Sequence, residues 1–112
     1  MASTRTVRIG QVAIGGDAPL ALVAGPCQAE GEQHSVDIAG RMAETCAALG
    51  IGYVFKASFD KANRTSLSGR RGPGLADGLA CLAAVKRAVG CPVLTDIHLP
   101  DQCAPAAEVA DI

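Results

Sequence analysis

The sequence predicts an α/β fold in which parallel strands alternate with helices. Two short apolar runs, at 20–24 and 53–55, lack the polar alternation of a half-exposed strand, and such runs are typical of strands inside a parallel sheet. Two longer segments carry apolar residues at helical spacing, and each ends just before a glycine. The composition agrees, since 49% of the 112 residues are hydrophobic and 19% are charged, which excludes a disordered chain.

The first half of the chain predicts a short hairpin or lead-in strand, followed by a strand and a helix. Residues 7–14 alternate loosely between apolar and polar side chains, and nearby glycines supply turns. The apolar run at 20–24 predicts a strand buried on both faces, and Gly25-Pro26 predicts its end. Ser35 is the expected N-cap of the first helix, and Gly50 is its expected C-terminal stop.

The second half repeats the alternation. The strand at 53–55 leads into a long polar stretch at 60–74. A second helix is predicted over 75–89, with basic residues in its last turn, where they oppose the helix dipole. A third strand is expected at 92–97 and a short third helix at 101–110.

This β-α-β-α-β-α order implies right-handed parallel crossovers, which both a doubly wound sheet and a β/α barrel contain. A closed barrel needs about 250 residues, and three strands alone leave two bare edges. Residues 108–112 carry no stop signal and look like the entry into a fourth strand. We therefore expect the chain to be the N-terminal part of a longer protein.

Charge and patterning exclude several classes of partner. The formal net charge of -1 provides no basic field to hold DNA or RNA, so no nucleic-acid partner is expected. No apolar run reaches the roughly 18 residues of a membrane-spanning helix, so no membrane partner is expected either. Five cysteines without a CxxC pair, behind an N-terminus that lacks a signal-peptide core, predict free thiols and a cytoplasmic location.

Reactive side chains gather where the predicted strands end, the usual place for a site in parallel α/β folds. The first exit carries Cys27, a candidate metal ligand or nucleophile, whereas the other four cysteines are interpreted as small buried hydrophobes. The third exit carries Asp96 and His98, whose spacing turns both side chains to one side of an extended chain. Read alone, Asp96 fits a helix cap and His98 an exposed loop residue.

The second exit is strongly basic. Five of the ten basic residues fall between 56 and 71, and Asp60 is the one acid in that stretch. Ammonium and guanidinium groups beside neutral donors suit the binding of phosphate or carboxylate. An ordinary solvated loop is the alternative, but Lys56 directly continues an apolar strand, where a solvated lysine is unusual.

Four segments together resemble one enzyme family. The run Lys-Ala-Ser-Phe-Asp-Lys-Ala-Asn-Arg-Thr-Ser at 56–66, followed by Arg-Gly-Pro-Gly-Leu at 71–75, is similar to the 3-deoxy-D-manno-octulosonate 8-phosphate synthases. Leu-Val-Ala-Gly-Pro-Cys at 22–27 and Thr-Asp-Ile-His at 95–98 match two further motifs of that family in the same order. The resemblance spans nearly the whole chain, and the Lys-Ala-Asn-Arg run is its most specific part.

The resemblance implies a TIM (β/α)8 barrel, with residues 1–19 as a lead-in hairpin and 20–112 as the first three β/α units of a single domain. The implied activity is a transferase reaction that condenses phosphoenolpyruvate with D-arabinose 5-phosphate. Its products are 3-deoxy-D-manno-octulosonate 8-phosphate, a lipopolysaccharide precursor, and inorganic phosphate. Both substrates are anions, as the basic stretch already suggested.

The resemblance also implies roles for individual residues. Six substrate-binding residues are implied: Lys56, Ser58, Lys61, Asn63, Arg64 and Thr65. The first three would bind phosphoenolpyruvate, and the last three would hold the phosphate end of arabinose 5-phosphate. Asp96 and His98 would be catalytic near the aldehyde and the phosphoenolpyruvate phosphate, and Lys61 would donate a proton or stabilise charge. In the family this motif works across a subunit boundary of a homotetramer.

Cys27 assigns the chain to the metal-dependent members, because the metal-independent members have Asn there. A divalent metal ion is therefore expected, with its remaining ligands beyond Ile112. Two departures from the family pattern are Thr65, where Ser is common, and Leu99, where Glu is frequent. One alternative is the related heptulosonate synthase, which uses erythrose 4-phosphate; the Lys-Ala-Asn-Arg run opposes it. The second alternative is a non-catalytic truncated fragment. In either case we expect these 112 residues alone to be inactive.

Overall fold

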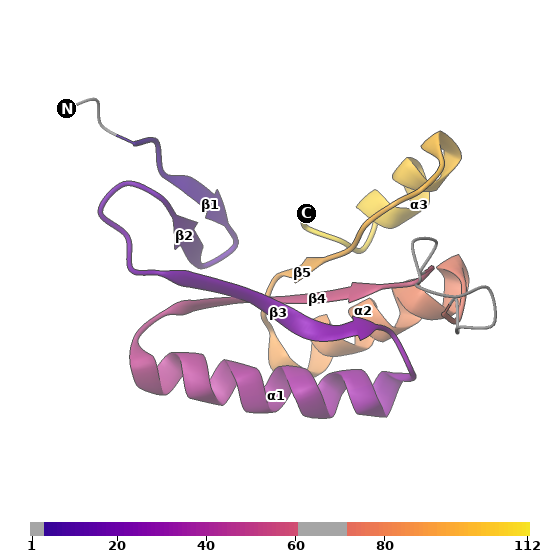
Figure 1. The fold of residues 1–112 in the computed structure, drawn as a ribbon, viewed down its shortest axis with the longest axis horizontal. Coiled ribbons are helices and arrows are strands. Elements are labelled where there is room, and N and C mark those ends of the chain that lie inside the picture. The colour runs from indigo at the N-terminus through magenta and orange to yellow at the C-terminus, as the bar shows by residue number, and fades with distance from the viewer. Residues whose placement is uncertain (1–3, 61–71) are drawn as a thin grey trace.

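The computed structural model describes residues 4–60 and 72–112 and contains a three-stranded parallel sheet with two long helices on one side (Figure 1). The strands are β3 (Ala21–Gln28), β4 (Gly52–Ser58) and β5 (Val93–Leu94), in the order β3-β4-β5. The predicted α/β class and its parallel crossovers are confirmed. In the part of the chain that is described, the sheet is open and does not close into a barrel.

The two covering helices are α1 (Glu32–Leu49) and α2 (Leu75–Val89). Each ends at a glycine in the left-handed region, Gly50 with φ 70° and Gly90 with φ 82°, as the sequence predicts. The start of α1 differs from the prediction, because Gly31 is the N-cap and Ser35 is buried inside the helix.

The faces of β4 decide which side chains can reach a site. Tyr53, Phe55 and Ala57 belong to the buried core under α1 and α2. Because side chains alternate along a strand, Lys56 and Ser58 face the other side of the sheet. Lys56 and Ser58 thus lie on the face opposite the helices, together with Val54, which is fully buried there.

Strand β3 does not stop at Gly25-Pro26 as predicted, but continues to Gln28 through a register shift between Ala24 and Cys27. One extra residue of β3 is accommodated there, as in a β-bulge. A Cβ on Gly25 would lie 1.7 Å from the carbonyl oxygen of Lys56, so only glycine allows the two strands this approach.

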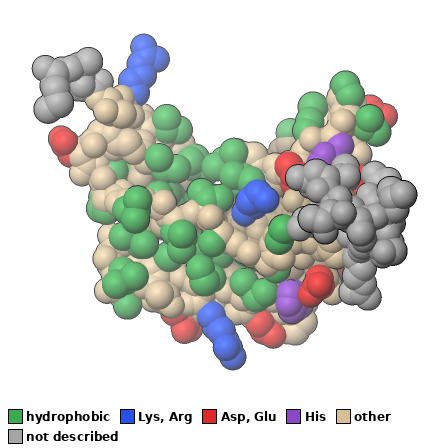
Figure 2. All heavy atoms as spheres, viewed as in Figure 1, with side chains coloured by type: hydrophobic (Ala, Val, Ile, Leu, Met, Phe, Trp, Pro, Cys, Tyr) green, Lys and Arg blue, Asp and Glu red, His purple; other side chains and the backbone are tan. Residues whose placement is uncertain are grey.

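The prediction that this first strand is buried on both faces is also wrong. Val23 is 41% exposed and Leu20 just before the strand is 76% exposed. In the view of Figure 2, hydrophobic side chains gather over the half of the molecule where β3 runs. β3 is an edge strand among the described residues, with β4 as its one strand neighbour.

The lead-in hairpin forms as predicted. Its strands β1 (Val7–Ile9) and β2 (Val12–Ile14) pair antiparallel. Val12 is buried against Gly52 at the start of β4, and Gly10 lies near Pro92 just before β5. The hairpin therefore contacts the beginnings of the sheet strands, at the end opposite their exits (Figure 1).

The third strand and the third helix are shorter than predicted. β5 has two residues, and a 3-10 turn, η1 (Pro100–Gln102), precedes a single-turn helix, α3 (Cys103–Ala107). The backbone of Asp111 donates to the carbonyl of Val93 at 2.9 Å, and Thr95 donates to that of Ile112 at 3.1 Å. These bonds support the expectation that the last residues enter a further strand beside β5.

All five cysteines are free. Cys46 and Cys81 are buried as predicted, but Cys103 is exposed and Cys91 is half-buried, so the interpretation of all four as buried fails for these two. Among the described helices, none combines the length and apolar character needed to cross a membrane.

Candidate active site at the strand exits

The exits of β3, β4 and β5 meet at one edge of the sheet. Cys27 pairs with Ala57 and Gln28 with Ser58 in the β3–β4 ladder, and the backbone of Ala29 donates to the carbonyl of Ser58 at 2.9 Å. The predicted gathering of the first two exits is therefore present in the backbone itself.

A short hydrogen bond joins the second exit to the third. The hydroxyl of Ser58 donates to Oδ1 of Asp96 at 2.5 Å, a length typical of a hydroxyl bound to a carboxylate. Ser58 is only 6% exposed, so its hydroxyl depends on this partner. Next to it, the hydroxyl of Thr95 donates to the carbonyl of Ala57 at 2.8 Å. The side-chain hydroxyls of Ser58 and Thr95 thus hold the segment that follows β5 against β4.

His98 lies beside Asp96, as their spacing predicts. Its Nε2 is 3.4 Å from Oδ2 of Asp96 and 2.6 Å from the main-chain oxygen of Asp60. The ring meets Phe59 edge to face, with centroids 5.9 Å apart. About a quarter of the His98 side chain is exposed, so the ring is held by neighbours yet remains reachable.

Lys56 is half-buried on the polar face, in the same strand as Ser58. Its ammonium group makes no hydrogen bond or ion pair with another described residue. Because no described side chain pairs with this cation, which lies two residues from the buried Ser58, it suits the binding of an anionic ligand.

Cys27, the residue before the last one of β3, has a backbone conformation that side chains rarely adopt. Its φ is 72°, and it is the one described residue other than glycine with a positive φ. Strained residues of this kind cluster at functional sites. Its thiol is exposed, which suits a metal ligand or a nucleophile.

Cys27 can supply one ligand of a metal site, but the described residues around it do not supply a complete set of ligands. In residues 4–60 and 72–112, no group of three or more His, Cys, Asp or Glu side chains lies close enough to hold a metal ion. A thiolate alone does not complete the four-coordinate shell of a metal such as zinc. Further ligands would have to come from residues that the structure does not describe.

Four predicted site residues, Lys61, Asn63, Arg64 and Thr65, lie outside the described residues. Their expected roles remain predictions. The described members of the predicted set are Cys27, Lys56, Ser58, Asp96 and His98. Direct contacts link Ser58, Asp96 and His98, and strand pairing places Cys27 opposite Ala57, the residue before Ser58.

Sequence reasoning missed the groups that hold His98. The main-chain oxygen of Asp60 and the ring of Phe59 carried no signal, since neither depends on a motif. Gln102 did carry one: its Oε1 accepts from the backbone N–H groups of His98 at 2.9 Å and Leu99 at 3.1 Å. Pro100 followed by Gln102 at the third helical position is a pattern typical of a helix start.

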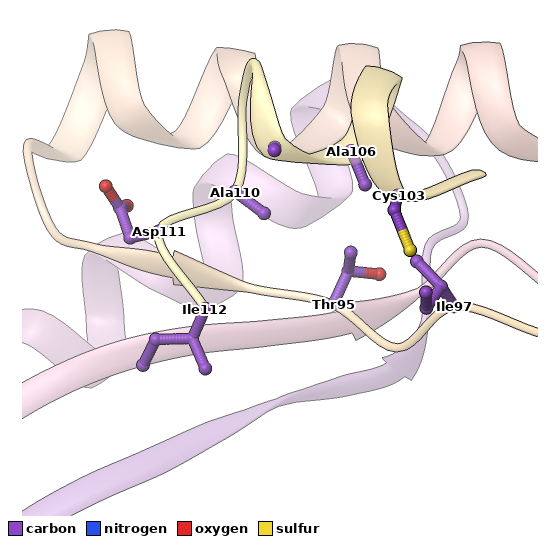
Figure 3. Close-up of a pocket in the computed structure, with 8 residues that line it drawn as sticks. Thr95, Ile97, Cys103, Ala106, Ala110, Asp111 and Ile112 are labelled. Carbon is purple, nitrogen blue, oxygen red and sulfur yellow. The ribbon is translucent and has the colours of Figure 1, made fainter. Parts of the chain in front are cut away.

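A cavity of about 300 Å³ lies beside these exits, between the end of β5 and α3 (Figure 3). Thr95 and Ile97 line it, and they alternate along the chain with Asp96 and His98. Apolar side chains of α3 and the last residues, including Ala106 and Ile112, form most of the rest. No predicted site residue that the structure describes lines this cavity.

Comparisons with known proteins agree on one family. A family profile described as the DAHP synthetase I family matches residues 2–112. A 2-dehydro-3-deoxyphosphooctonate aldolase of Citrifermentans bemidjiense is 54% identical over 109 residues, which are 97% of this chain and 40% of that protein. Proteins of the same name are 52% identical in Chelativorans sp., over 95% of this chain and 38% of theirs, and in Brucella ovis, over 96% and 39%. The chain thus spans about 40% of the length of these curated relatives.

Proposed function

The chain belongs to the DAHP synthetase I family, and from that membership and the geometry of the strand exits we propose that it is the N-terminal part of a 3-deoxy-D-manno-octulosonate 8-phosphate synthase. The name shared by the relatives denotes this enzyme. The proposed reaction joins phosphoenolpyruvate to D-arabinose 5-phosphate, consumes one water molecule and releases inorganic phosphate.

We propose that residues 1–112 form part of a single TIM barrel domain, with the hairpin at 1–19 beneath the barrel and three β/α units in 20–112. The open sheet with helices on one side supports this arrangement. The opposite face, which carries Lys56 and Ser58, would then face the barrel interior. The free edge of β3 among the described residues would pair with a strand of the remaining units, and residues 111–112, which bond beside β5, would begin the next strand there.

Phosphoenolpyruvate is the proposed ligand of Lys56, Ser58 and Lys61. The Lys56 ammonium group has no hydrogen-bond or ion-pair partner among residues 4–60 and 72–112, which supports this role. Asn63, Arg64 and Thr65 are proposed to hold the phosphate of arabinose 5-phosphate, through one guanidinium group and neutral donors. Thr65 keeps the hydroxyl group that Ser commonly provides in the family.

The new bond joins C3 of phosphoenolpyruvate to the aldehyde carbon of the sugar, and water adds at C2 as the bond to the phosphate breaks. Holding the two carbons together supplies much of the rate. Negative charge grows on the aldehyde oxygen and on the departing phosphate, and fixed donors stabilise it. We assign this stabilisation to Lys61 and His98, with Asp96 fixing the position of the His98 ring.

Cys27 is the proposed ligand of a divalent metal ion in this chain. Its exposed thiol at a strand exit supports the assignment, and the other ligands are proposed to come from later strands. When bound, the metal would polarise the aldehyde or activate water. We also propose a homotetramer in the cytoplasm, on the basis of the resemblance to this family.

The observation that carries the proposal is the Ser58–Asp96–His98 contact set, two residues from a lysine, Lys56, that has no partner in the described part of the chain. The test is a chimera in which this chain replaces the matching N-terminal region of the Citrifermentans bemidjiense protein. We expect product and inorganic phosphate from phosphoenolpyruvate with arabinose 5-phosphate. The intact relative is the positive control, and its C-terminal region alone is the negative control.

The same assay separates the alternatives. A chimera that prefers erythrose 4-phosphate would identify a heptulosonate synthase. A folded chimera that is inactive with either sugar would favour the non-catalytic fragment. Either result overturns the proposed function.

A further inference from the structure

The ring of His98 has one nitrogen against groups that can only accept a hydrogen bond. Its Nε2 faces the main-chain oxygen of Asp60 at 2.6 Å and Oδ2 of Asp96 at 3.4 Å. A carbonyl has no proton to give, and neither has an ionised carboxylate. Rotating the ring to place a carbon there is excluded, because C–H···O contacts need about 3.3 Å or more. Nε2 must therefore carry a hydrogen.

The carbonyl of Asp60 is itself held firmly. Phe59, the preceding residue, is 2% exposed, and its main-chain oxygen accepts from the backbone of Gly74 at 3.0 Å. The first turns of α2 pack so closely on it that a Cβ on Gly78 would lie 2.2 Å from the Cβ of Phe59. Gln102 fixes the backbone of His98 from the other side. The His98 ring and the Asp60 carbonyl are thus each held by separate contacts, and their relative position is fixed.

The other ring nitrogen, Nδ1, has no hydrogen-bond partner among the described residues. We infer that His98 uses Nε2 as a permanently protonated anchor and presents Nδ1 to the substrate. A neutral ring then accepts a hydrogen bond from a hydroxyl at Nδ1, and a ring with a second proton donates to a phosphoryl oxygen there. This assignment deepens the proposed function, and Phe59 and Asp60 become positioning residues for the same site.

The tautomer can be measured directly in the 112-residue chain by nitrogen NMR of its two histidines. We expect the neutral ring of His98 to show a protonated Nε2 and an unprotonated Nδ1. His34 is the internal control, because its side chain is 43% exposed on α1 and its ring nitrogen Nε2 lies 3.5 Å from the exposed carboxylate of Glu30. A His34→Gln variant assigns the signals. Protonation at Nδ1 of His98, or averaging of both forms as in an exposed histidine, overturns the inference.

An Asp96→Asn variant, measured in the same spectra, shows whether the Asp60 carbonyl or the Asp96 carboxylate sets the tautomer of His98. The Asp60 carbonyl remains, so we expect the tautomer of His98 to persist. A switch to the form protonated at Nδ1 would show that the Asp60 carbonyl does not set the tautomer.

The functional part of the inference is tested in the chimera with His98→Asn and His98→Gln. Asparagine places an amide near the position of Nδ1, and glutamine places one near Nε2. We expect His98→Asn to retain about tenfold more kcat than His98→Gln, the effect of about one hydrogen bond. Equal losses, or the reverse order, overturn the role of Nδ1. If the unaltered chimera makes no product, the proposed function fails while the tautomer measurement stands on its own.

Discussion

Ser58 and Asp96, 38 positions apart, are joined by a hydroxyl-to-carboxylate hydrogen bond of 2.5 Å that ties the exit of β4 to that of β5. The bond connects two predicted site residues and also stabilises the fold. Its contribution to stability can be measured separately from any role in the site, because unfolding measurements on the chain do not involve substrate.

A double-mutant cycle measures the strength of this bond. Hydrogen bonds to charged groups contribute about 1.5–3 kcal/mol, and exposure of Asp96 lowers that to about 1 kcal/mol. We therefore expect Ser58→Ala and Asp96→Ala to be coupled by about 1 kcal/mol in urea unfolding. Additive effects, within about 0.5 kcal/mol, would show that the bond contributes nothing measurable.

Two helix glycines form a matched pair for testing the packing behind the site. A Cβ on Gly78 would lie 2.2 Å from the Cβ of Phe59, whereas a Cβ on Gly40 would meet nothing within 4 Å. Gly40→Ala should stabilise the chain by up to about 1 kcal/mol through helix propensity. Gly78→Ala should destabilise it by about 1–3 kcal/mol through overpacking. Thermal unfolding of both variants checks this, and stabilisation by Gly78→Ala would contradict the packing.

The backbone of Cys27 predicts an unusual order of stabilities. At φ 72°, a side chain is strained and glycine is not. Cys27→Gly and Cys27→Ala both remove the thiol, but we expect the glycine variant to be more stable by about 0.5–1 kcal/mol. Urea unfolding of the two compares them directly. An alanine variant at least as stable as the glycine variant would show that Cys27 is not strained.

Tyr53 is the chain's one tyrosine, so its titration can be followed by tyrosinate absorbance. Its hydroxyl donates to the carbonyl of Ala24 at 2.8 Å, and burial raises the pKa of Tyr53 well above its ordinary value of 10.0. Above about pH 10 the unfolded chain loses this proton and the folded chain keeps it, so stability falls as pH rises from there. Tyr53→Phe should cost about 1 kcal/mol at neutral pH and flatten that fall. Titration of Tyr53 near pH 10 in the folded chain would contradict this account.

Local signals predicted the elements, and contacts between distant residues decided the details. Glycine stops placed the ends of α1 and α2, because left-handed caps depend on one residue type. Gly25-Pro26 was wrongly predicted to end the strand. The glycine is needed instead because the Lys56 carbonyl of the neighbouring strand comes close to it. Ser35 misled the prediction for a local reason, because α1 already begins at Glu32 after Gly31 and Ser35 lies inside the helix.

The candidate site shows the same division. The Asp-x-His spacing correctly predicted that His98 lies beside Asp96. The Ser58–Asp96 bond and the Asp60 carbonyl depend on how β4 and β5 are packed. No spacing within the sequence encodes those contacts.

The central claim is that these strand exits hold two phosphorylated substrates, and steady-state kinetics of the chimera test it most directly. We expect Lys56→Ala to raise the KM for phosphoenolpyruvate, and Arg64→Ala to raise the KM for arabinose 5-phosphate, each by roughly tenfold or more. Each variant should leave the KM for the other substrate much less changed. If both variants keep the KM values and the kcat of the unaltered chimera, these side chains do not bind the substrates, and the account is contradicted.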